Sequence, residues 1–455
     1  MKKRKRALKI FKKLHKWPAI VIALFAILFA FSGIVMNHRQ LFSPVDVSRK
    51  LLHHNYRYNN WNLAAARGSE QINQNSILVY GNVGVWQSDG EFENFSDFNQ
   101  GFPSGIDNRK IYSVKRFKNE IFAGTHMGLF KRPLKNGKWE KVNLNLHKER
   151  IADLALKGDT LLVLSRHYLL KTADGINFEK IQLPEPVGYE RKTGLFNTFW
   201  ELHSGELWGL PGKLIVDLLG IVTLFLSVTG LLHFFFPKMI KRRKKKQKPV
   251  KPLARATKKN LSLHNVVGYI FVFFLLINTF SGMHLRPPLL IAIANKQVGI
   301  IPGTHLDSPN PWFDKLRRIH WDNENGIYIF STSEGFYFTD EYFTGKLQPV
   351  RSQPPVSVMG CNVFEPLKGD NYLVGSFSGL FIWNIQSGAV TNFITGKPYI
   401  PPTGMTSPIG ADMAAGLVQG NNHAFWFDYN SGAISLTGDI FPEMPAEILQ
   451  KTPMS

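Results

Sequence analysis

The chain has 455 residues, 44% of them hydrophobic and 13% aromatic, a composition that excludes a disordered protein and leaves room for two or more domains. Its formal net charge is +22, and 21 of those charges lie in two acid-free runs, residues 1–17 and 238–259. Both runs border hydrophobic segments, so they favour the positive-inside rule over binding to nucleic acid. The single cysteine, Cys361, excludes an intrachain disulfide, a thiolate zinc cluster and an all-cysteine iron–sulfur centre.

Three apolar segments are long enough to cross a bilayer, which takes about 20 residues. They predict three transmembrane helices, at residues 17–38, within residues 201–237 and at residues 263–286. The second helix follows an aromatic interfacial stretch at the start of its range. The third segment shows no polar stripe of the kind that a soluble helix has, and it carries a histidine near each end. The second contains Asp217, which we expect to face a protein partner because an ionised carboxylate is costly in hydrocarbon.

Two basic stretches set the expected orientation. Residues 1–16 form a basic tail before the first span, and residues 238–262 form a basic loop between the second and the third. The positive-inside rule then predicts a bacterial inner-membrane protein with a cytoplasmic N-terminus and a periplasmic C-terminus. A cleaved signal peptide is the alternative at the N-terminus, but the apolar run exceeds a signal h-region and lacks an A-x-A-type cleavage site.

Residues 39–200 and 287–455 have the short alternating runs and the Gly, Asn and Asp turns of β-structure. Similar segments align through Gly84, Gly128 and Tyr168 in the first part and through Gly335, Gly379 and Ala424 in the second. Their spacings are 44 and 40, then 44 and 45 residues, within the period of about 40–50 that is typical of propeller blades. The expected fold class is membrane α plus all-β, with one six-bladed periplasmic β-propeller assembled from two halves, residues 60–190 and 315–440; two independent β-domains are the alternative.

A second internal repeat relates the first and third spans. The two segments align without a gap when their residue numbers differ by 249. In this alignment, the Leu-His pair that ends at His15 matches the pair that ends at His264, and Phe-Ser-Gly at 31–33 matches Phe-Ser-Gly at 280–282. Two helices that run in the same direction therefore carry equivalent histidines. They also carry small residues, which permit close approach of helix backbones or of a flat ligand.

Six of the 14 histidines lie at the ends of the predicted spans. His15, His233 and His264 belong to the cytoplasmic ends, and His38, His203 and His284 belong to the outer ends. For any one of them, an interfacial histidine bonded to headgroups or backbone is the alternative, but three at each face favour metal ligation. Neutral imidazoles on helices suit the axial positions of haem b, whereas zinc would need thiolate or carboxylate ligands that these helices barely offer.

The equivalent positions of His15 and His264 predict one haem b between them, with His233 able to replace either histidine. A second haem b at the outer face would use His203 together with His284 or His38. We therefore expect one or two haems, each bound by two histidines.

Four motifs resemble the PepSY-associated transmembrane proteins. They are LHKWPAI at Leu14–Ile20, LHSGELWGLPGK at Leu202–Lys213, VTGLLHFF at Val228–Phe235 and LHNVVGYI at Leu263–Ile270. Some members of that family are haem-containing reductases of the bacterial inner membrane that help to release iron from siderophores. The resemblance implies roles for His15, His203 and His264. It covers the spans and their borders only, since blade-like repeats stand where a PepSY domain would be.

These observations predict an inner-membrane haem protein that transfers electrons to a periplasmic acceptor. The resemblance implies that this acceptor is a ferric siderophore or another iron complex, and that the activity is of the ferric-reductase type. The basic run at 238–259 has 22 residues. A nicotinamide-binding βαβ unit needs about 30, so the expected electron donor is a membrane quinol or a separate redox protein. The alternative is a non-enzymatic, membrane-anchored propeller that binds a ligand or a protein as a sensor or assembly factor.

Overall fold

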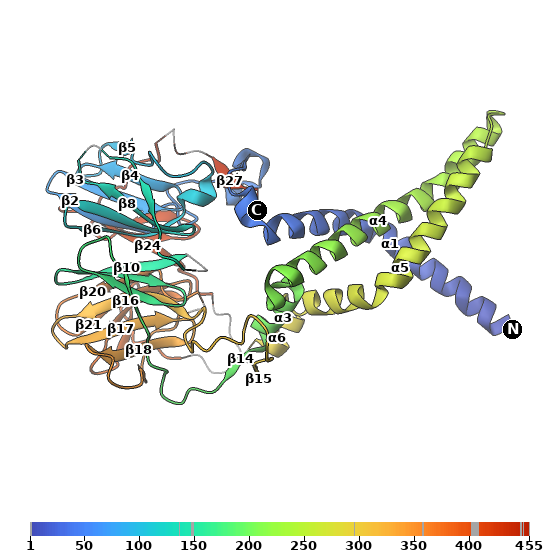
Figure 1. Cartoon of the computed structure of the whole chain (residues 1–455). Coiled ribbons are helices and arrows are strands. Elements are labelled where there is room, and N and C mark those ends of the chain that lie inside the picture. Colours follow the sequence, from blue (N-terminus) through green and yellow to red (C-terminus); the bar gives the residue numbers. More distant parts are fainter. Residues whose placement is uncertain are drawn as a thin grey trace. The chain divides into compact units, whose positions relative to one another are not determined.

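The computed structural model describes residues 2–454 except 136, 147–149, 295, 357–358, 402–408, 446–447 and 449. It divides into two compact units (Figure 1). Helices form most of the first, Met1–Phe42 with Glu190–Ser308, and β-sheets form the second, Ser43–Tyr189 with Pro309–Met454. Each unit is therefore built from separate stretches of the sequence.

Three long helices make up most of the helical unit. They are α1 (Lys2–Asn37), α4 (Gly209–Lys245) and α5 (Lys251–Met283), and α4 packs against both of the others. Each is long and apolar enough to cross a membrane, as the sequence predicts. The shorter elements are α2 (Arg39–Phe42), α3 (Leu195–Ser204), η4 (Glu206–Trp208), α6 (Leu289–Ile293) and the antiparallel pair β14 (Lys192–Gly194) and β15 (Gln297–Gly299).

Helical structure continues through the two basic stretches, where the sequence predicts a tail and a loop. Helix α1 begins at Lys2, and only residues 246–250 separate α4 from α5. The connection between the second and third spans is therefore mostly helical, and the cytoplasmic placement of residues 238–262 stays a prediction. Lys, Arg, Ala and Leu are strong helix formers, and the four basic residues in the last turn of α4 interact favourably with the negative end of the helix dipole.

Six small antiparallel sheets form the β-rich unit, three from each stretch of sequence. The blades of the first half are β2–β5 (Gly68–Asn73, Ser76–Gly81, Gly84–Ser88, Phe95–Asp97), β6–β9 (Ile111–Phe117, Glu120–Thr125, Gly128–Pro133, Glu140–Val142) and β10–β13 (Ile151–Lys157, Thr160–Ser165, Leu169–Thr172, Glu179–Ile181). Those of the second half are β16–β19 (Leu316–Asp322, Ile327–Thr332, Gly335–Asp340, Gln348–Pro349), β20–β23 (Val363–Pro366, Asn371–Ser376, Gly379–Asn384, Val390–Asn392) and β24–β26 (Ala414–Gln419, Ala424–Asp428, Gly432–Ser435). Outside the blades, β1 (Asp46–Ser48) pairs with β27 (Lys451–Pro453), and single 3-10 turns lie at Arg49–Leu51, His54–Tyr56 and Ile106–Arg109.

The six blades close into one ring. Their first strands are the innermost, and these contact one another from blade to blade, including β10 with β16 and β24 with β2. One apolar core joins Trp86 of the first blade to Phe425 of the sixth, and another joins Leu164 of the third blade to Phe330 of the fourth. Because both junctions between the halves are packed, the sheets form a single six-bladed propeller rather than two independent domains, as the repeats predict.

The alignment of the sixth repeat unit is wrong by one strand. Gly84, Gly128, Gly335 and Gly379 each begin the third strand of a blade. Ala424, which the repeat places with them, begins the second strand of its blade, and Gly432 is the structural equivalent. In this three-stranded blade, the turn before the second strand and the turn before the third strand each place a small residue before an apolar run. The sequence pattern alone therefore does not distinguish the two turns.

Candidate functional site

The first candidate site is a group of histidines at the basic end of the helices, the end that carries residues 1–16 and 238–262. His15 on α1 and His264 on α5 face each other with ring centroids 6.4 Å apart and ring planes tilted by 59°. With nitrogen–metal bonds of about 2.0 Å, two imidazoles on opposite sides of one ion have ring centres about 6 Å apart. The pair that the internal repeat brings together could therefore hold one metal ion between its two rings.

Thr229 on α4 is a hydrogen-bond partner of Nδ1 of His264, and the direction of its own hydroxyl bond favours one tautomer of that ring. The Thr229 hydroxyl donates to the backbone oxygen of Phe225 at 2.7 Å, so its oxygen is free to accept from Nδ1 of His264, 2.8 Å away. Asn260 in turn donates to the backbone oxygen of Thr229 at 2.8 Å. With its proton on Nδ1, His264 keeps the lone pair of Nε2 for a metal, the arrangement that metal-ligating histidines usually have.

His233 is the third histidine of this end. It lies on α4 within electrostatic range of His264, and its Nδ1 atom is buried without a hydrogen-bond partner among the described residues. A buried polar atom without a partner is costly, so this nitrogen requires a hydrogen-bond partner such as a water molecule or a bound group. Gly230, one turn earlier on the same helix, lies against the His264 ring, where an added Cβ would come within 3.6 Å.

At the opposite end of the helices, His38 pairs with a carboxylate. Its Nε2 lies 2.6 Å from Oδ2 of Asp217, and the side-chain amide of Asn37 donates to the other carboxylate oxygen at 3.3 Å and to the backbone oxygen of Ser204 at 3.1 Å. Asp217 is buried, with 8% of its surface exposed. It therefore faces protein partners, as the sequence analysis anticipates.

His203 and His284 contact separate neighbours at this end. His203 Nδ1 donates to the backbone oxygen of Asn278 at 3.0 Å, and His284 Nδ1 donates to that of Phe280 at 2.9 Å. The His284 ring also stacks on Phe199, with centroids 4.8 Å apart. Among the described residues, no ring contact or hydrogen bond joins His38, His203 and His284 to one another, so the proposed outer pairings stay predictions.

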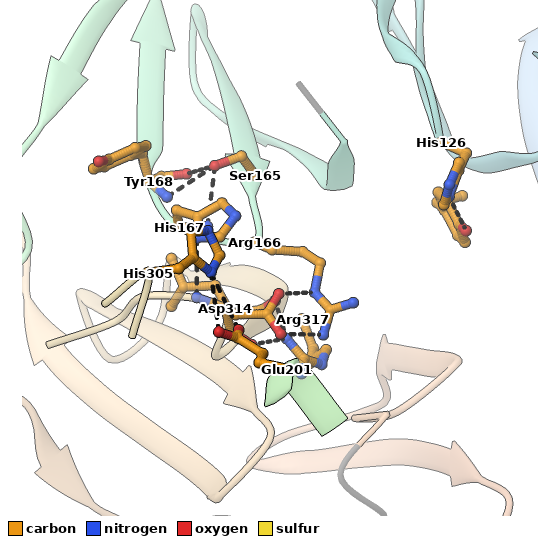
Figure 2. Close-up of polar contacts among 11 residues, drawn as sticks. His126, Ser165, Arg166, His167, Tyr168, Glu201, His305, Asp314 and Arg317 are labelled. Carbon is orange, nitrogen blue, oxygen red and sulfur yellow. Dashed lines mark hydrogen bonds and ion pairs between the residues drawn. The ribbon is translucent and has the colours of Figure 1, made fainter. Parts of the chain in front are cut away.

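One polar pair of the helical unit was not anticipated from the sequence. Nδ1 of His305 lies 3.2 and 3.3 Å from the two carboxylate oxygens of Glu201, and Figure 2 shows the two side chains pointing toward each other. Glu201 is buried, and no sequence signal links it to a histidine more than 100 residues away. The part of the chain that the structure describes contains no cluster of three or more His, Cys, Asp or Glu side chains that could hold a bare metal ion.

The fold and these side chains define a membrane protein with three spans, histidines at the span ends and a β-propeller formed by its two non-membrane stretches. The family model of the PepSY-associated TM region matches residues 1–236, just over half of the chain, so the protein belongs to that family. The motifs at Leu14–Ile20, Leu202–Lys213 and Val228–Phe235 lie inside the match. The motif at Leu263–Ile270, which contains His264, lies beyond it.

Solved structures match the chain at low sequence identity and with low TM-scores. The extracellular domain of the hybrid two-component system BT4673 from B. thetaiotaomicron is 9% identical with a TM-score of 0.40; the match covers 82% of this chain, which spans only 32% of that protein. YCF48 bound to a D1 peptide is 9% identical with a TM-score of 0.34, over 84% of this chain and 96% of the other. The computationally designed protein Ika8 gives the same identity and TM-score over 82% and 96%. No curated protein matches the sequence.

Proposed function

We propose that this protein is a haem b-binding electron-transfer protein of the bacterial inner membrane. The observation that carries the proposal is the facing pair of His15 and His264, with Thr229 holding the tautomer that leaves Nε2 of His264 open. Nδ1 of His233, near this pair, is buried without a hydrogen-bond partner among the described residues, which is compatible with a further group there.

Each residue of this group has a distinct part in the proposed site. His15 and His264 would hold the haem iron, and His233 is positioned to replace either of them. Thr229 and Asn260 keep the His264 ring and the α4 backbone in place, which is how residues behind a metal ligand control its orientation and basicity. Bound haem would supply one-electron redox chemistry.

The electron donor and acceptor follow from the surroundings of the site. The five residues between α4 and α5 leave no room for a nucleotide-binding unit, which supports a membrane quinol or a separate redox protein as donor. The positive-inside rule, applied to the two basic stretches, supports a cytoplasmic N-terminus and a periplasmic propeller. We propose a periplasmic iron complex, such as a ferric siderophore, as acceptor, on the resemblance of the chain to siderophore-iron reductases.

Haem content in three single-histidine variants tests the proposal. We expect His264→Ala and His15→Ala, purified in detergent from haem-sufficient cells, to lose most of the haem per protein in a pyridine haemochrome measurement. His54→Ala is the control, since that histidine belongs to the β-rich unit, where its ring lies against the ring of His53. Equal haem content in the wild type, His264→Ala and His15→Ala would contradict the proposal.

A further inference from the structure

A cluster of arginines lies where the innermost strands of the propeller begin. Since every complete blade starts with its innermost strand, the first residues of these strands gather at one end of the central channel. Arg67 directly precedes β2, Arg150 directly precedes β10, and Arg317 is the second residue of β16. Arg166, in the turn between β11 and β12, completes this arginine cluster.

Two of these arginines share one aromatic ring. The guanidinium carbons of Arg67 and Arg150 lie 5.1 and 4.7 Å from the ring centroid of Tyr112 on β6. The described acceptors of Arg67 are neutral amide oxygens, those of Asn82 and Asn362, at 3.4 Å. Nε of Arg150 is buried and has no hydrogen-bond partner among the described residues. Neither guanidinium therefore has a carboxylate among its described partners.

The carboxylate of Asp314 lies at the other side of the cluster, and Glu334 also acts electrostatically on Arg317. Asp314 accepts a hydrogen bond from Nη2 of Arg166 at 3.1 Å and forms an ion pair with Nε of Arg166 at 2.8 Å, and the backbone oxygen of Asp314 accepts from Arg317 at 2.7 Å. Figure 2 shows Asp314 with Arg166 and Arg317 directed toward it. Further along the inner strands, by contrast, positive and negative groups are matched, as in Arg318 with Asp153 at 2.8 Å.

The arginines also act on one another electrostatically. Burial and the neighbouring charge of Arg166 lower the pKa of Arg317 to about 9, and burial and the charge of Arg150 lower the pKa values of Arg67 and Arg166. Like charges held close together cost free energy, and an anion bound between them would remove that cost.

We propose that Arg67, Arg150 and Arg166, together with Tyr112, form a binding site for a small multivalent oxyanion at this end of the propeller channel. Guanidinium groups match the planar oxygen pairs of carboxylates and phosphates, so the ligand class is an oligocarboxylate, free or bound to iron, or a phosphate. The site goes beyond the proposed electron transfer and does not depend on bound haem.

Calorimetric titration of the full-length protein in detergent, in a dilute chloride buffer, tests this site. The probes are citrate, ferric citrate and inorganic phosphate, which distinguish a free carboxylate, its iron complex and a phosphate as the source of the oxyanion. We expect at least one of them to bind the wild type, and Arg150→Gln and Arg67→Gln to weaken that binding roughly 10- to 100-fold, the effect of losing a charged hydrogen bond.

Arg132→Gln is the matched control, because its guanidinium carbon also lies over an aromatic ring, 3.7 Å from the centroid of Phe98, and its Nε is also buried without a described partner. Arg132 belongs to the third strand of its blade, away from the channel. If Arg150→Gln fails to fold, Arg150→Lys replaces it in the test. Lysine keeps the positive charge but lacks the planar guanidinium that pairs with two oxygens of the anion, so we expect Arg150→Lys to bind the probes more weakly than the wild type. No binding by the wild type to any of the three probes, or equal loss in Arg132→Gln, would overturn the proposal.

Discussion

Cys361 shows how the propeller core changes the chemistry of a single residue. Its side chain lies among Phe336, Phe364 and other apolar residues, with 4% of its surface exposed. Burial raises the pKa of the thiol to about 11, so almost no thiolate, the reactive form, exists at neutral pH.

We therefore expect iodoacetamide at pH 8 to leave Cys361 unmodified in the folded protein and to alkylate it completely after denaturation, as mass spectrometry would show. The denatured sample also serves as the control for reagent quality. Rapid alkylation of the folded protein would mean that this core is open.

The sequence predicted individual site residues only where a repeat marked them. His15 and His264 are equivalent in the internal repeat, and the structure places their rings together. Thr229 could not be predicted as the partner of His264, because it lies 35 residues away on another helix and no spacing rule links the two. The free-energy cost of an ionised carboxylate in lipid predicts a protein partner for Asp217, but only the fold identifies His38 as that partner.

At the scale of the helices, Gly282 and Gly33 provide a matched pair of substitutions. The two glycines are equivalent in the internal repeat. A Cβ at Gly282 would lie 2.7 Å from the ring of His203, whereas a Cβ at Gly33 would meet nothing within 4 Å. Gly282→Ala should therefore displace His203 and break its hydrogen bond to Asn278, at a cost of about 1 kcal/mol.

Gly33→Ala should leave stability unchanged or raise it slightly, because Ala is the better helix former by about 1 kcal/mol. Thermal unfolding of both variants in the same detergent measures the difference. Equal melting temperatures for the two variants would show that the contact between Gly282 and His203 does not stabilise the protein.

Element boundaries were harder to predict than the elements themselves. Hydropathy identifies the apolar cores of α1, α4 and α5. It measures solubility in lipid and not helix propensity, so it does not predict that the helices continue into the basic stretches. The repeat period identified six blades. It misplaced Ala424, because one turn of a hairpin resembles the next in local sequence and only pairing between strands separates them.

At the scale of the whole propeller, His423 connects the last blade to the first. Its Nδ1 lies 2.6 Å from Asp439, which follows the sixth blade, and its Nε2 lies 2.6 Å from Glu91 of the first blade. Hydrogen bonds to Asp439 and Glu91 raise the pKa of His423 above its usual value near 6.5. Protonated His423 therefore stabilises the ring closure between the two halves.

The sign of the pH dependence follows from the raised pKa in the folded state. The stabilisation is fully present below about pH 6.5 and is lost as the pH rises through the folded-state pKa. We expect His423→Gln to lower the melting temperature at pH 6 and to have a smaller effect at pH 9. A difference from the wild type that does not change with pH would contradict this contribution to ring closure.

The central claim is that two histidines from separate spans bind one haem. The reduced-minus-oxidised visible spectrum of the detergent-purified wild type, recorded with and without carbon monoxide, tests it most directly. We expect low-spin Soret and α bands that carbon monoxide leaves unchanged, because His15 and His264 would fill both axial positions of a bound haem. Spectra without haem bands, or haem bands that shift fully with carbon monoxide, would contradict it; the former would favour a membrane-anchored propeller that acts as a sensor or assembly factor.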